Sequence, residues 1–506
     1  MHKVAKLTTA AMFGALVMGA ASGCGAKYDL LLWTGFGSSY SSAVQSLIDR
    51  YEEVSGVKIG HESQGSYDKL QTNMNNSIST GAYPNIANGY PDHFAGYIRS
   101  SIQLPLDPYI KAYNDAHPGE DLLSDYYDSY LKEVRSLRYN ADGSPLTMGL
   151  PFNKSTEVMG YNAYFLDYAM AKDPTITKIP DTWDEWKVVG AKMLTLMDDL
   201  YGKYLYGKVS ADDSDKFTEY QISESEEAPE GFDLVLDFHL VTKEKFRLMC
   251  WDATDNMFIT IVRQWGGEYT SYSAEDAKTV QHGWAEFYSG DSKDKTLSAL
   301  NFFKGLYDDG IFGLSSDISD DSYSSTGFKN NQCMFTICSS GGLSYNIGTF
   351  RFKLHAIPYK DADHKYVISQ GTNLALFDQG SDEDKQKSFD AIVSLTRGAL
   401  QGSWAVETGY YPASKSATAT EAYQALLTQP QANPTKRAYQ ESAILNESTY
   451  MKVEEKWDKF VDPGFVGSSS IRQEVKTIMS IVFGGERTPD EILTESYTRI
   501  SDYVRK

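Results

Sequence analysis

Cysteine is scarce in this chain of 506 residues, which contains only four. One is Cys24, and the spacing of Cys250, Cys333 and Cys338 fits neither a disulfide framework nor a metal site. Cys333 and Cys338 fall in a stretch that we expect to form one strand, which would place them on opposite faces. Either one of them bridges Cys250, or all three are buried free thiols.

Positive charge is also scarce: 47 Lys and Arg face 68 Asp and Glu, for a net charge of −21. No basic stripe with interleaved aromatics occurs, so a nucleic-acid partner is not expected. A globular composition of this length exceeds one hydrophobic core and predicts two or more lobes. Tyrosine is abundant, with 35 residues. Its flat apolar face and hydroxyl suit a recognition surface as well as a core.

Long apolar runs are absent beyond the N-terminus. Lys3 and Lys6 precede Leu7–Ala21, a run of 15 residues that is too short to span a bilayer. Ala21-Ser22-Gly23-Cys24 follows. This arrangement resembles a bacterial lipoprotein signal (residues 1–23) with cleavage before Cys24 and lipid on its sulfur, although Leu is usual where Ala21 stands. The alternative is an ordinary secretory signal with an incidental cysteine.

Recognised catalytic motifs are lacking as well. The chain has no HExxH, phosphate-binding loop or GxSxG elbow, and Tyr40 replaces the third glycine of a dinucleotide fingerprint after Gly35 and Gly37. No cofactor is therefore expected. The cluster Asp361-Ala-Asp363-His364 is interpreted as a polar hairpin turn rather than a metal site. Carboxylates are too numerous to exclude a glycosidase by residue type, but no pair is marked as catalytic.

The start of the chain alternates between strand and helix patterns. Strands are expected over 28–33, 57–63 and 84–90, with helices over about 44–54 and 70–78 and Gly56 ending the first helix. This order predicts a parallel sheet covered on both faces. Ligands lie at the carboxyl ends of such strands, so the loops 35–39, 65–68 and 89–93 should line one edge.

Three capping patterns predict helix starts, at Thr182 with Glu185, at Thr488 with Glu491 and at Ser470 with Gln473. The last puts Arg472 in a first turn, where a cation costs about 0.3–1 kcal/mol unless an anion lies nearby. That anion is either a carboxylate of the protein or an anionic ligand held by the helix terminus, serine hydroxyls and the arginine. Residues 202–245 are acidic and poor in aliphatics, and are interpreted as a partly flexible surface insertion.

Taken together, these features resemble the extracellular solute-binding proteins of ABC importers, a group that includes maltose-binding and glycerol-3-phosphate-binding proteins. The resemblance rests on the order of motifs along the mature chain, which are LLLWTGFGSS (30–39), GSYDKL (65–70), YPNIANGYPDH (83–93), LPFNKSTEVMGYN (150–162), PDTWDEW (180–186), QWGGEYT (264–270), NQCMFTICSSGG (331–342), GTNLALF (371–377), ETGYYPASKSA (407–417) and GSSSIR (467–472).

The resemblance implies a two-lobed α/β fold of the periplasmic-binding-protein type (type II), with the ligand in a cleft between the lobes. The N-terminal lobe would comprise 28–153 plus 370–409, and the C-terminal lobe 154–369 plus 410–506. Residues 24–27 would be the lipidated N-terminus and a spacer. LPFNKST, SQGTN and TGYYP would be interlobe crossings, with 153–156 facing the cleft.

The resemblance also implies a ligand wall. Asp92 lies beside Pro91, where the glycerol-3-phosphate binders carry Glu, and Trp265 is equally interpretable as packing. Glu157 has no assigned role. The full predicted set is Trp33, Tyr67, Asp92, Ser155, Trp265, Glu268, Ser339, Ser340, Gly341, Gly371, Tyr410 and Arg472.

The implied function is capture of a carbohydrate and its delivery to permease subunits, by a monomer that is lipid-anchored on the outer side of the cell membrane. No metal is implied. The alternative within the same family is a glycerol-3-phosphate or glycerophosphodiester ligand, favoured by Arg472 and the serines. A hypothesis of another class is a secreted glycosidase.

Overall fold

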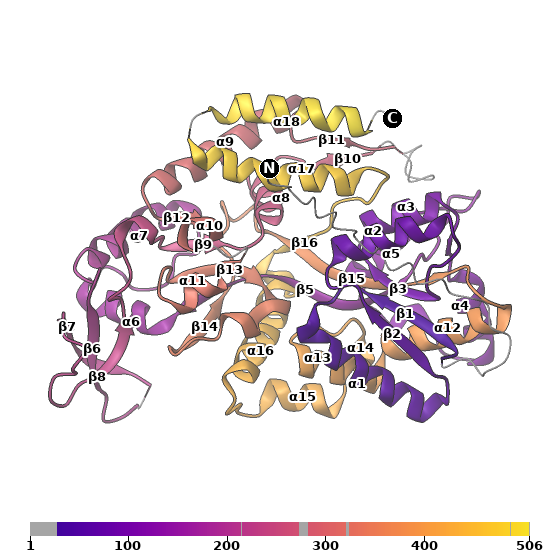
Figure 1. The fold of residues 1–506 in the computed structure, drawn as a ribbon, viewed down its shortest axis with the longest axis horizontal. Helices are drawn as coiled ribbons and strands as arrows, with labels where there is room; N and C mark the ends of the chain where they lie inside the picture. The colour runs from indigo at the N-terminus through magenta and orange to yellow at the C-terminus, as the bar shows by residue number, and fades with distance from the viewer. Residues whose placement is uncertain (1–27, 214, 273–281, 320–322, 486, 505–506) are drawn as a thin grey trace, which may run out of the picture.

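One twisted sheet runs through the whole computed structural model, which describes residues 28–213, 215–272, 282–319, 323–485 and 487–504 (Figure 1). Its strand order is β12-β9-β13-β5-β15-β3-β1-β2, with β14 paired to β5, and β4 and β16 paired to β15. The strands are β1 Leu30–Thr34, β2 Ile59–Ser63, β3 Ile86–Gly89, β4 Gln103–Leu104, β5 Leu150–Asn162, β9 Met249–Trp251, β12 Phe312–Leu314, β13 Phe335–Ser339, β14 Phe352–His355, β15 Tyr366–Phe377 and β16 Asp458–Phe460.

The N-terminal lobe has the predicted alternation of strands and helices. β1 pairs in parallel with β2 and with β3. Its residues are alternately buried and half-buried, as expected for a parallel strand that is covered on both faces. Gly56 ends α1 in the left-handed conformation, with φ 72°. The helical elements of this lobe are α1 Ser38–Ser55, α2 Tyr67–Ile78, α3 Pro91–Arg99, α4 Asp107–Ala116, η1 Leu122–Asp125, α5 Asp128–Arg135, α12 Asp382–Leu395 and α13 Gly398–Thr408. α14 Lys415–Thr418, expected in the C-terminal lobe, bonds to η1 of this lobe through Ser416.

Two long strands connect the halves of the sheet. Residues 150–156 of β5 pair antiparallel with β15, whereas residues 157–161 of the same strand pair with β13 on the other side. β15 in turn pairs with β3 in the N-terminal lobe and with β16 in the C-terminal lobe. LPFNKSTEVMGYN is therefore one continuous strand that passes from one half of the sheet to the other.

Residues 153–156, expected to face the cleft, are all buried, and the side chain of Lys154 points into a polar network. The Lys154 ammonium lies 2.6 Å from a Glu133 carboxylate oxygen and donates to the Asn373 side chain at 3.0 Å. Ser369 donates to the other oxygen of Glu133 at 3.2 Å. A buried charge must be paired, so these side chains point into a polar network at the crossings instead of into the cleft.

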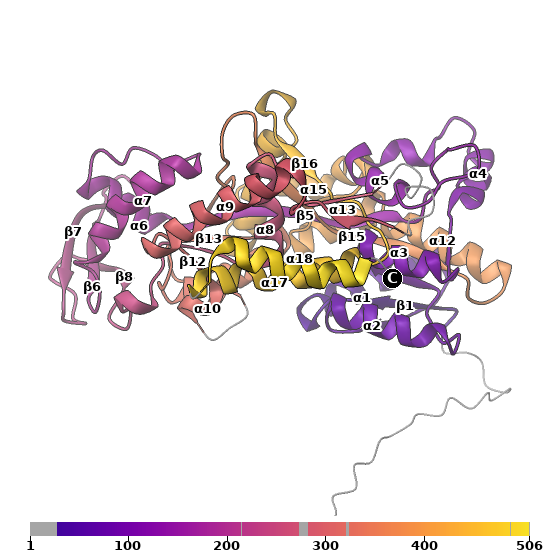
Figure 2. The same cartoon turned by 90° about the horizontal axis from the view of Figure 1, so that it is seen from above.

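Helices cover the sheet of the C-terminal lobe, and α17 and α18 form one edge of the molecule (Figures 1 and 2). The helices of this lobe are α6 Ala163–Lys172, α7 Trp183–Met197, α8 Thr254–Gln264, α9 Gly290–Asp308, α10 Ser315–Ile318, α11 Ser325–Lys329, α15 Glu421–Thr428, α16 Pro434–Leu445, α17 Ser468–Gly484 and α18 Pro489–Val504. Shorter elements are β10 Thr270–Ser271, β11 Trp284–Ala285, η2 Lys243–Lys245, η4 Ser340–Asn346, η5 Asn446–Tyr450 and η6 Val453–Glu455.

Two of the three predicted helix starts are confirmed. Thr182 and Glu185 form a capping box at α7, and Thr488 accepts from the Glu491 N–H at 3.3 Å at the start of α18. The third is wrong, because α17 begins at Ser468 after Gly467, whose φ of 100° only glycine adopts readily. Arg472 consequently lies one turn further into α17 than expected.

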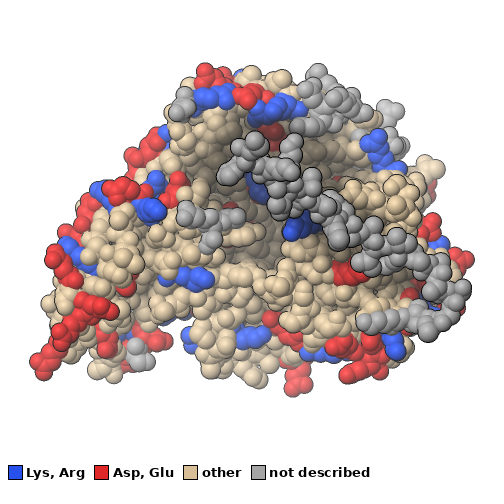
Figure 3. Space-filling view, in the orientation of Figure 1, with Lys and Arg blue, Asp and Glu red and all other residues tan. Residues whose placement is uncertain are grey.

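The acidic segment 202–245 is more ordered than its composition predicts. It forms a three-stranded antiparallel sheet of order β7-β6-β8, from β6 Tyr204–Val209, β7 Phe217–Ser223 and β8 Asp233–Asp237. β6 buries Leu205 and Tyr206, which anchor the sheet. The sheet projects at the lower left of Figure 1, and acidic side chains gather over it in Figure 3.

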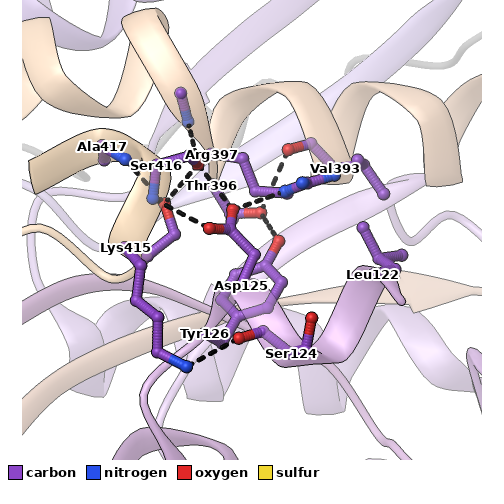
Figure 4. A network of polar contacts seen from close by, with 12 residues as sticks. Leu122, Ser124, Asp125, Tyr126, Val393, Thr396, Arg397, Lys415, Ser416 and Ala417 are labelled. Atoms are coloured by element: carbon purple, nitrogen blue, oxygen red, sulfur yellow. Dashed lines mark hydrogen bonds and ion pairs between the residues drawn. The ribbon is translucent and has the colours of Figure 1, made fainter. Parts of the chain in front are cut away.

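A polar network fastens the third chain crossing to the N-terminal lobe (Figure 4). Arg397, just before α13, donates to Asp125 of η1 at 2.7 Å, and the Ser416 hydroxyl of α14 donates to the same carboxylate at 2.5 Å. The adjacent Tyr126 hydroxyl lies 2.6 Å from that of Thr396. These contacts tie α13 and α14 to η1 and hold the segment that carries Tyr410.

The three described cysteines are free and buried. β13 begins at Phe335, so Cys333 lies outside that strand and the expectation of opposite faces is wrong. Cys24 lies outside the described residues. His364 and Asp361 form a local pair at 2.8 Å in a turn, and the described ranges hold no group of three metal-ligating side chains. No helix within those ranges is long and apolar enough to cross a membrane.

Candidate functional site

Four tyrosines from separate elements meet beside the crossing strands, and we call them the tyrosine cluster: Tyr40 of α1, Tyr67 of α2, Tyr90 before α3, and Tyr410 after α13. The Tyr67 ring packs edge-on against Tyr90, with 5.0 Å between centroids, and the rings of Tyr40 and Tyr410 lie 5.6 Å apart. Burial raises the pKa of the Tyr67, Tyr90 and Tyr410 hydroxyls. These hydroxyls therefore keep their protons and can donate hydrogen bonds.

Serine hydroxyls from the other lobe adjoin this cluster. Ser339, at the end of β13, lies with its Oγ 3.4 Å from that of Ser155 on β5. Ser340 accepts from the backbone N–H of Thr156 at 3.2 Å. The Tyr40 hydroxyl donates to the Gly341 carbonyl and so joins α1 to the C-terminal lobe. The structure thus brings together Ser155, Ser339, Ser340 and Gly341, four members of the expected ligand wall.

Gly341 lies so close to the tyrosine cluster that a residue with a side chain does not fit there. A Cβ added there would lie 2.5 Å from the Tyr410 ring, a separation that real Cβ atoms do not show. Gly371 is constrained even more tightly, with φ 101° and only 1.7 Å between a built Cβ and the Asn153 carbonyl oxygen. Gly371 lets backbone approach backbone at the crossing, whereas Gly341 leaves room for the Tyr410 ring.

A cavity of about 290 Å³ opens beside Tyr40. It lies where α1 and α13 of the N-terminal lobe meet η4 and α16 of the C-terminal lobe. Its walls offer hydroxyls, two aromatic side chains and one carboxylate, from Ser39, Tyr40, Ser42, Ala43, Ser344, Glu407, Thr408 and Tyr439. Its volume is close to the lower limit of about 300 Å³ for small-molecule pockets.

A charged group borders the tyrosine cluster on its other side, where Figure 3 shows the surface hollowed below α17 and α18. Arg472 of α17 donates from Nε to Asp255 of α8 at 2.7 Å, and from Nη2 to Asn256. Asp92, at the start of α3 in the N-terminal lobe, and Tyr90 act electrostatically on the same guanidinium. The negative partner of Arg472 is thus a carboxylate of the protein, the first of the two alternatives left by the sequence.

Trp33 lies next to the end of β1, and Tyr67, expected in the loop 65–68, is the first residue of α2. Trp33 is the fourth residue of β1, and its indole N–H is buried with no hydrogen-bond acceptor among the described residues. Tyr67 begins α2 and accepts from the Asn153 side chain at 3.3 Å. An unpaired buried donor costs about 1–3 kcal/mol, so the indole N–H of Trp33 lowers stability as long as it has no acceptor.

Trp265 and Glu268 have neighbours other than the tyrosine cluster. Trp265 packs against Phe302 and Phe303 of α9, with ring centroids 5.3 and 5.8 Å away. Glu268 is exposed and pairs with Arg263 at 2.9 Å, and Arg263 also pairs with Asp462 at 2.7 Å. Trp265 therefore has the neighbours of a packing residue, whereas Glu268 belongs to the charged surroundings of the site.

Sequence reasoning missed Tyr40, Tyr90, Tyr439 and Asp255. Tyr40 and Tyr90 adjoin loops at the carboxyl ends of β1 and β3, which is the edge expected to line a ligand site, so a signal for them was present. Tyr439 lies within α16 and Asp255 in the first turn of α8. Neither position carries a local pattern that distinguishes it from an ordinary helix residue.

Solved structures share this fold over nearly the whole chain. The glycerophosphocholine complex of UgpB from Mycobacterium tuberculosis is 17% identical with a TM-score of 0.65, over 94% of this chain and 98% of that one. The Lmo0181 protein of Listeria monocytogenes, in complex with cycloalternan, is 14% identical with a TM-score of 0.64, over 94% of this chain and 98% of that one. A putative oligosaccharide-binding protein from Synechococcus sp. is 13% identical with a TM-score of 0.64, over 94% of this chain and 99% of that one.

The two-lobed α/β fold of periplasmic binding proteins is therefore confirmed. No curated protein sequence matches the chain. The sequence profile described as "Bacterial extracellular solute-binding protein" matches residues 46–431, which is more than half of the chain. The members of this family and the similar structures are binding proteins, and the family is extracellular by its description. The chain belongs to the bacterial extracellular solute-binding protein family.

Proposed function

We propose that this protein is the solute-binding lipoprotein of an ABC importer, and that it captures a carbohydrate between its lobes and delivers it to permease subunits. The observation that carries the proposal is the combination of the tyrosine cluster with the hydroxyl-lined cavity. Aromatic faces pack against the C–H surfaces of a sugar, and hydroxyls and carboxylates bond to its O–H groups. Mono- and oligosaccharides both present such surfaces.

Unsatisfied polar atoms near the crossings support a polar ligand. The Trp33 indole N–H and the Tyr269 hydroxyl are both buried without a partner among the described residues. A ligand that pairs with them recovers the cost of their desolvation. Capture would close the lobes by a hinge motion, since the ligand stabilises the state in which both walls contact it.

A glycerophosphodiester is the second candidate, favoured by the position of Arg472 beside the cleft. The structure of UgpB, at 17% identity, is a complex with glycerophosphocholine, and structures of sugar-binding proteins occur at similar identity. Arg472 is already paired with Asp255, so a phosphate would have to compete with that carboxylate. The carbohydrate is therefore the preferred ligand.

A thermal-shift screen of the purified protein tests the proposal. A ligand at about 100 times its Kd adds about 2.7 kcal/mol to the unfolding free energy, so the melting temperature should rise with at least one mono- or oligosaccharide. Glycerol 3-phosphate and glycerophosphocholine form the second arm of the screen. A melting temperature unchanged by every carbohydrate contradicts the preferred ligand class.

We also propose that the protein does not act as an enzyme and that it carries a lipid anchor. A glycosidase would release product sugars over hours, whereas a receptor leaves the bound sugar intact, so chromatography of the recovered ligand separates the two. Lipid on Cys24 would hold the mature chain on the outer side of the membrane, where a monomer can meet its permease. Co-purification with two permease subunits would support delivery.

A further inference from the structure

Arg472 is a cation beside the tyrosine cluster, where its charge acts on Tyr90, and two of its N–H donors are already in use. Nε donates to Asp255 at 2.7 Å, and Nη2 donates to the Asn256 side chain. The Asp255 side chain is 18% exposed and the Arg472 side chain 34%. A charge-assisted pair of this kind is among the stronger hydrogen bonds in proteins, so the carboxylate of Asp255 balances the charge that an anionic ligand would otherwise meet.

Further carboxylates surround the pair. Asp92 reaches it from the opposite lobe, and Asp462 acts on the same guanidinium. Asp462 is itself paired with Arg263 at 2.7 Å, as is Glu268. Four carboxylates therefore face two arginines in this part of the cleft, which leaves an excess of negative charge.

The buried Tyr269 hydroxyl lies inside this group. It has no hydrogen-bond partner among the described residues, and its electrostatic neighbours are Arg472, Asp462, Asp255 and Asp92. A phosphate or carboxylate at the same place would face the surplus of negative charge, and like charges brought together weaken binding strongly.

We propose that Asp255 is a specificity-determining residue, which occupies Arg472 and thereby keeps anionic solutes out of the cleft while neutral polyols and sugars are admitted. The inference rests on the proposed function for the location of the ligand. It goes beyond that function because it assigns ligand selection to a particular ion pair. Without the negative charge of Asp255, the same arginine would become a partner for an anion.

The test compares sn-glycerol 3-phosphate with glycerol and maltose, by calorimetric titration of the full chain in detergent. The wild type should bind maltose and show weak or no binding of glycerol 3-phosphate. Asp255→Asn keeps the shape and one acceptor for Arg472 but removes the charge. It should bind glycerol 3-phosphate about tenfold or more tightly than the wild type does, with a smaller change for the neutral probes.

Two further variants assign the effect. Asp490→Asn removes a carboxylate that is also in a first helical turn and pairs with Lys293 at 2.9 Å, and it should leave all three affinities unchanged. In the double variant Asp255→Asn/Arg472→Gln, the gain for glycerol 3-phosphate should disappear. A purely structural role for Asp255 predicts loss of binding for every probe and no gain for the anion.

Failure of this inference is distinguishable from failure of the proposed function. If the wild type binds maltose and Asp255→Asn gains no affinity for glycerol 3-phosphate, the role of Asp255 is overturned and the proposed receptor function is unaffected. Tight binding of glycerol 3-phosphate by the wild type also overturns that role, and that arm does not depend on the variant folding. If the wild type does not bind maltose but Asp255→Asn binds glycerol 3-phosphate more tightly than the wild type does, the role of Asp255 is supported and the carbohydrate is contradicted as the ligand class.

Discussion

The carboxylate of Glu157 accepts a hydrogen bond from the indole N–H of Trp251 at 2.6 Å in the interior of the C-terminal lobe. Glu157 is 1% exposed, and the Thr260 hydroxyl lies 3.4 Å from its other oxygen. No basic side chain bonds to it among the described residues. Burial raises the pKa of Glu157 to about 8, because the charged form loses its hydration without gaining a counterion.

Replacement of Glu157 by Gln should stabilise the protein increasingly as the pH rises. The folded pKa of this acid lies above its ordinary value of 4.5, so the wild type loses stability from about pH 4.5 to about 8 as the folded state resists ionisation. The slope reaches at most about 1.4 kcal/mol per pH unit. Urea denaturation at pH 5 to 9 measures it, with exposed Glu53→Gln as control. Parallel stability profiles of the variant and the wild type would contradict the buried neutral acid.

Replacement of Glu133 by Gln should destabilise the protein strongly. Lys154 is 0% exposed and Glu133 is 3% exposed, so the variant leaves a buried ammonium without its counterion. Removing one partner of such a pair costs about 3–5 kcal/mol. Burial already lowers the pKa of Lys154, so the loss should shrink as the pH rises and the lysine sheds its proton.

The matched control for that prediction is Glu441→Gln, which removes a carboxylate from a surface pair with Lys353 at 3.0 Å. Their side chains are 30% and 44% exposed, and such pairs contribute about 0–1 kcal/mol. Urea midpoints at pH 7 compare the two variants. An equal, small loss in both would mean that water reaches Lys154 in solution.

The sequence predicted local elements better than long-range partners. β1, α1, β2, α2 and β3 lie where hydrophobic periodicity and Gly56 placed them, because those signals act within a few residues. The start of α17 was missed because the left-handed Gly467 outweighed a plausible cap at Ser470. The β6–β8 sheet was missed because acidic residues on its exposed face concealed the buried side chains of β6.

The candidate site divides in the same way. Ser339, Ser340 and Gly341 follow the end of β13 and lie beside Ser155 of β5, because β13 pairs with β5 at this point. Asp255 was not predicted as the partner of Arg472, since 217 positions of chain separate them and carboxylates are common throughout this sequence. Lys154 was assigned to the cleft for a similar reason: its counterion lies on α5, and no local pattern indicates the pairing.

A large side chain in the cavity should block ligand capture without unfolding the protein. Ser42 lines the cavity from the exposed side of α1, so Ser42→Trp should weaken carbohydrate binding about tenfold or more by occupying the space of the ligand. Val54→Trp, at an 81% exposed position of the same helix, is the control and should bind normally. Calorimetric titration with circular dichroism checks both. Undiminished binding in Ser42→Trp would place the ligand elsewhere between the lobes.

Replacement of Cys24 by Ser should release the protein from the membrane. A lipid chain contributes about 0.8 kcal/mol per buried CH₂, and stable attachment needs more than one chain, so loss of the modified sulfur should remove the anchor. Labelling with an alkyne fatty acid and membrane fractionation give the readout, with Ser22→Ala as control because it keeps a small residue before the cysteine. Label on the wild type that is absent from Cys24→Ser supports lipidation. Unlabelled wild-type protein in the medium instead indicates an ordinary secretory signal.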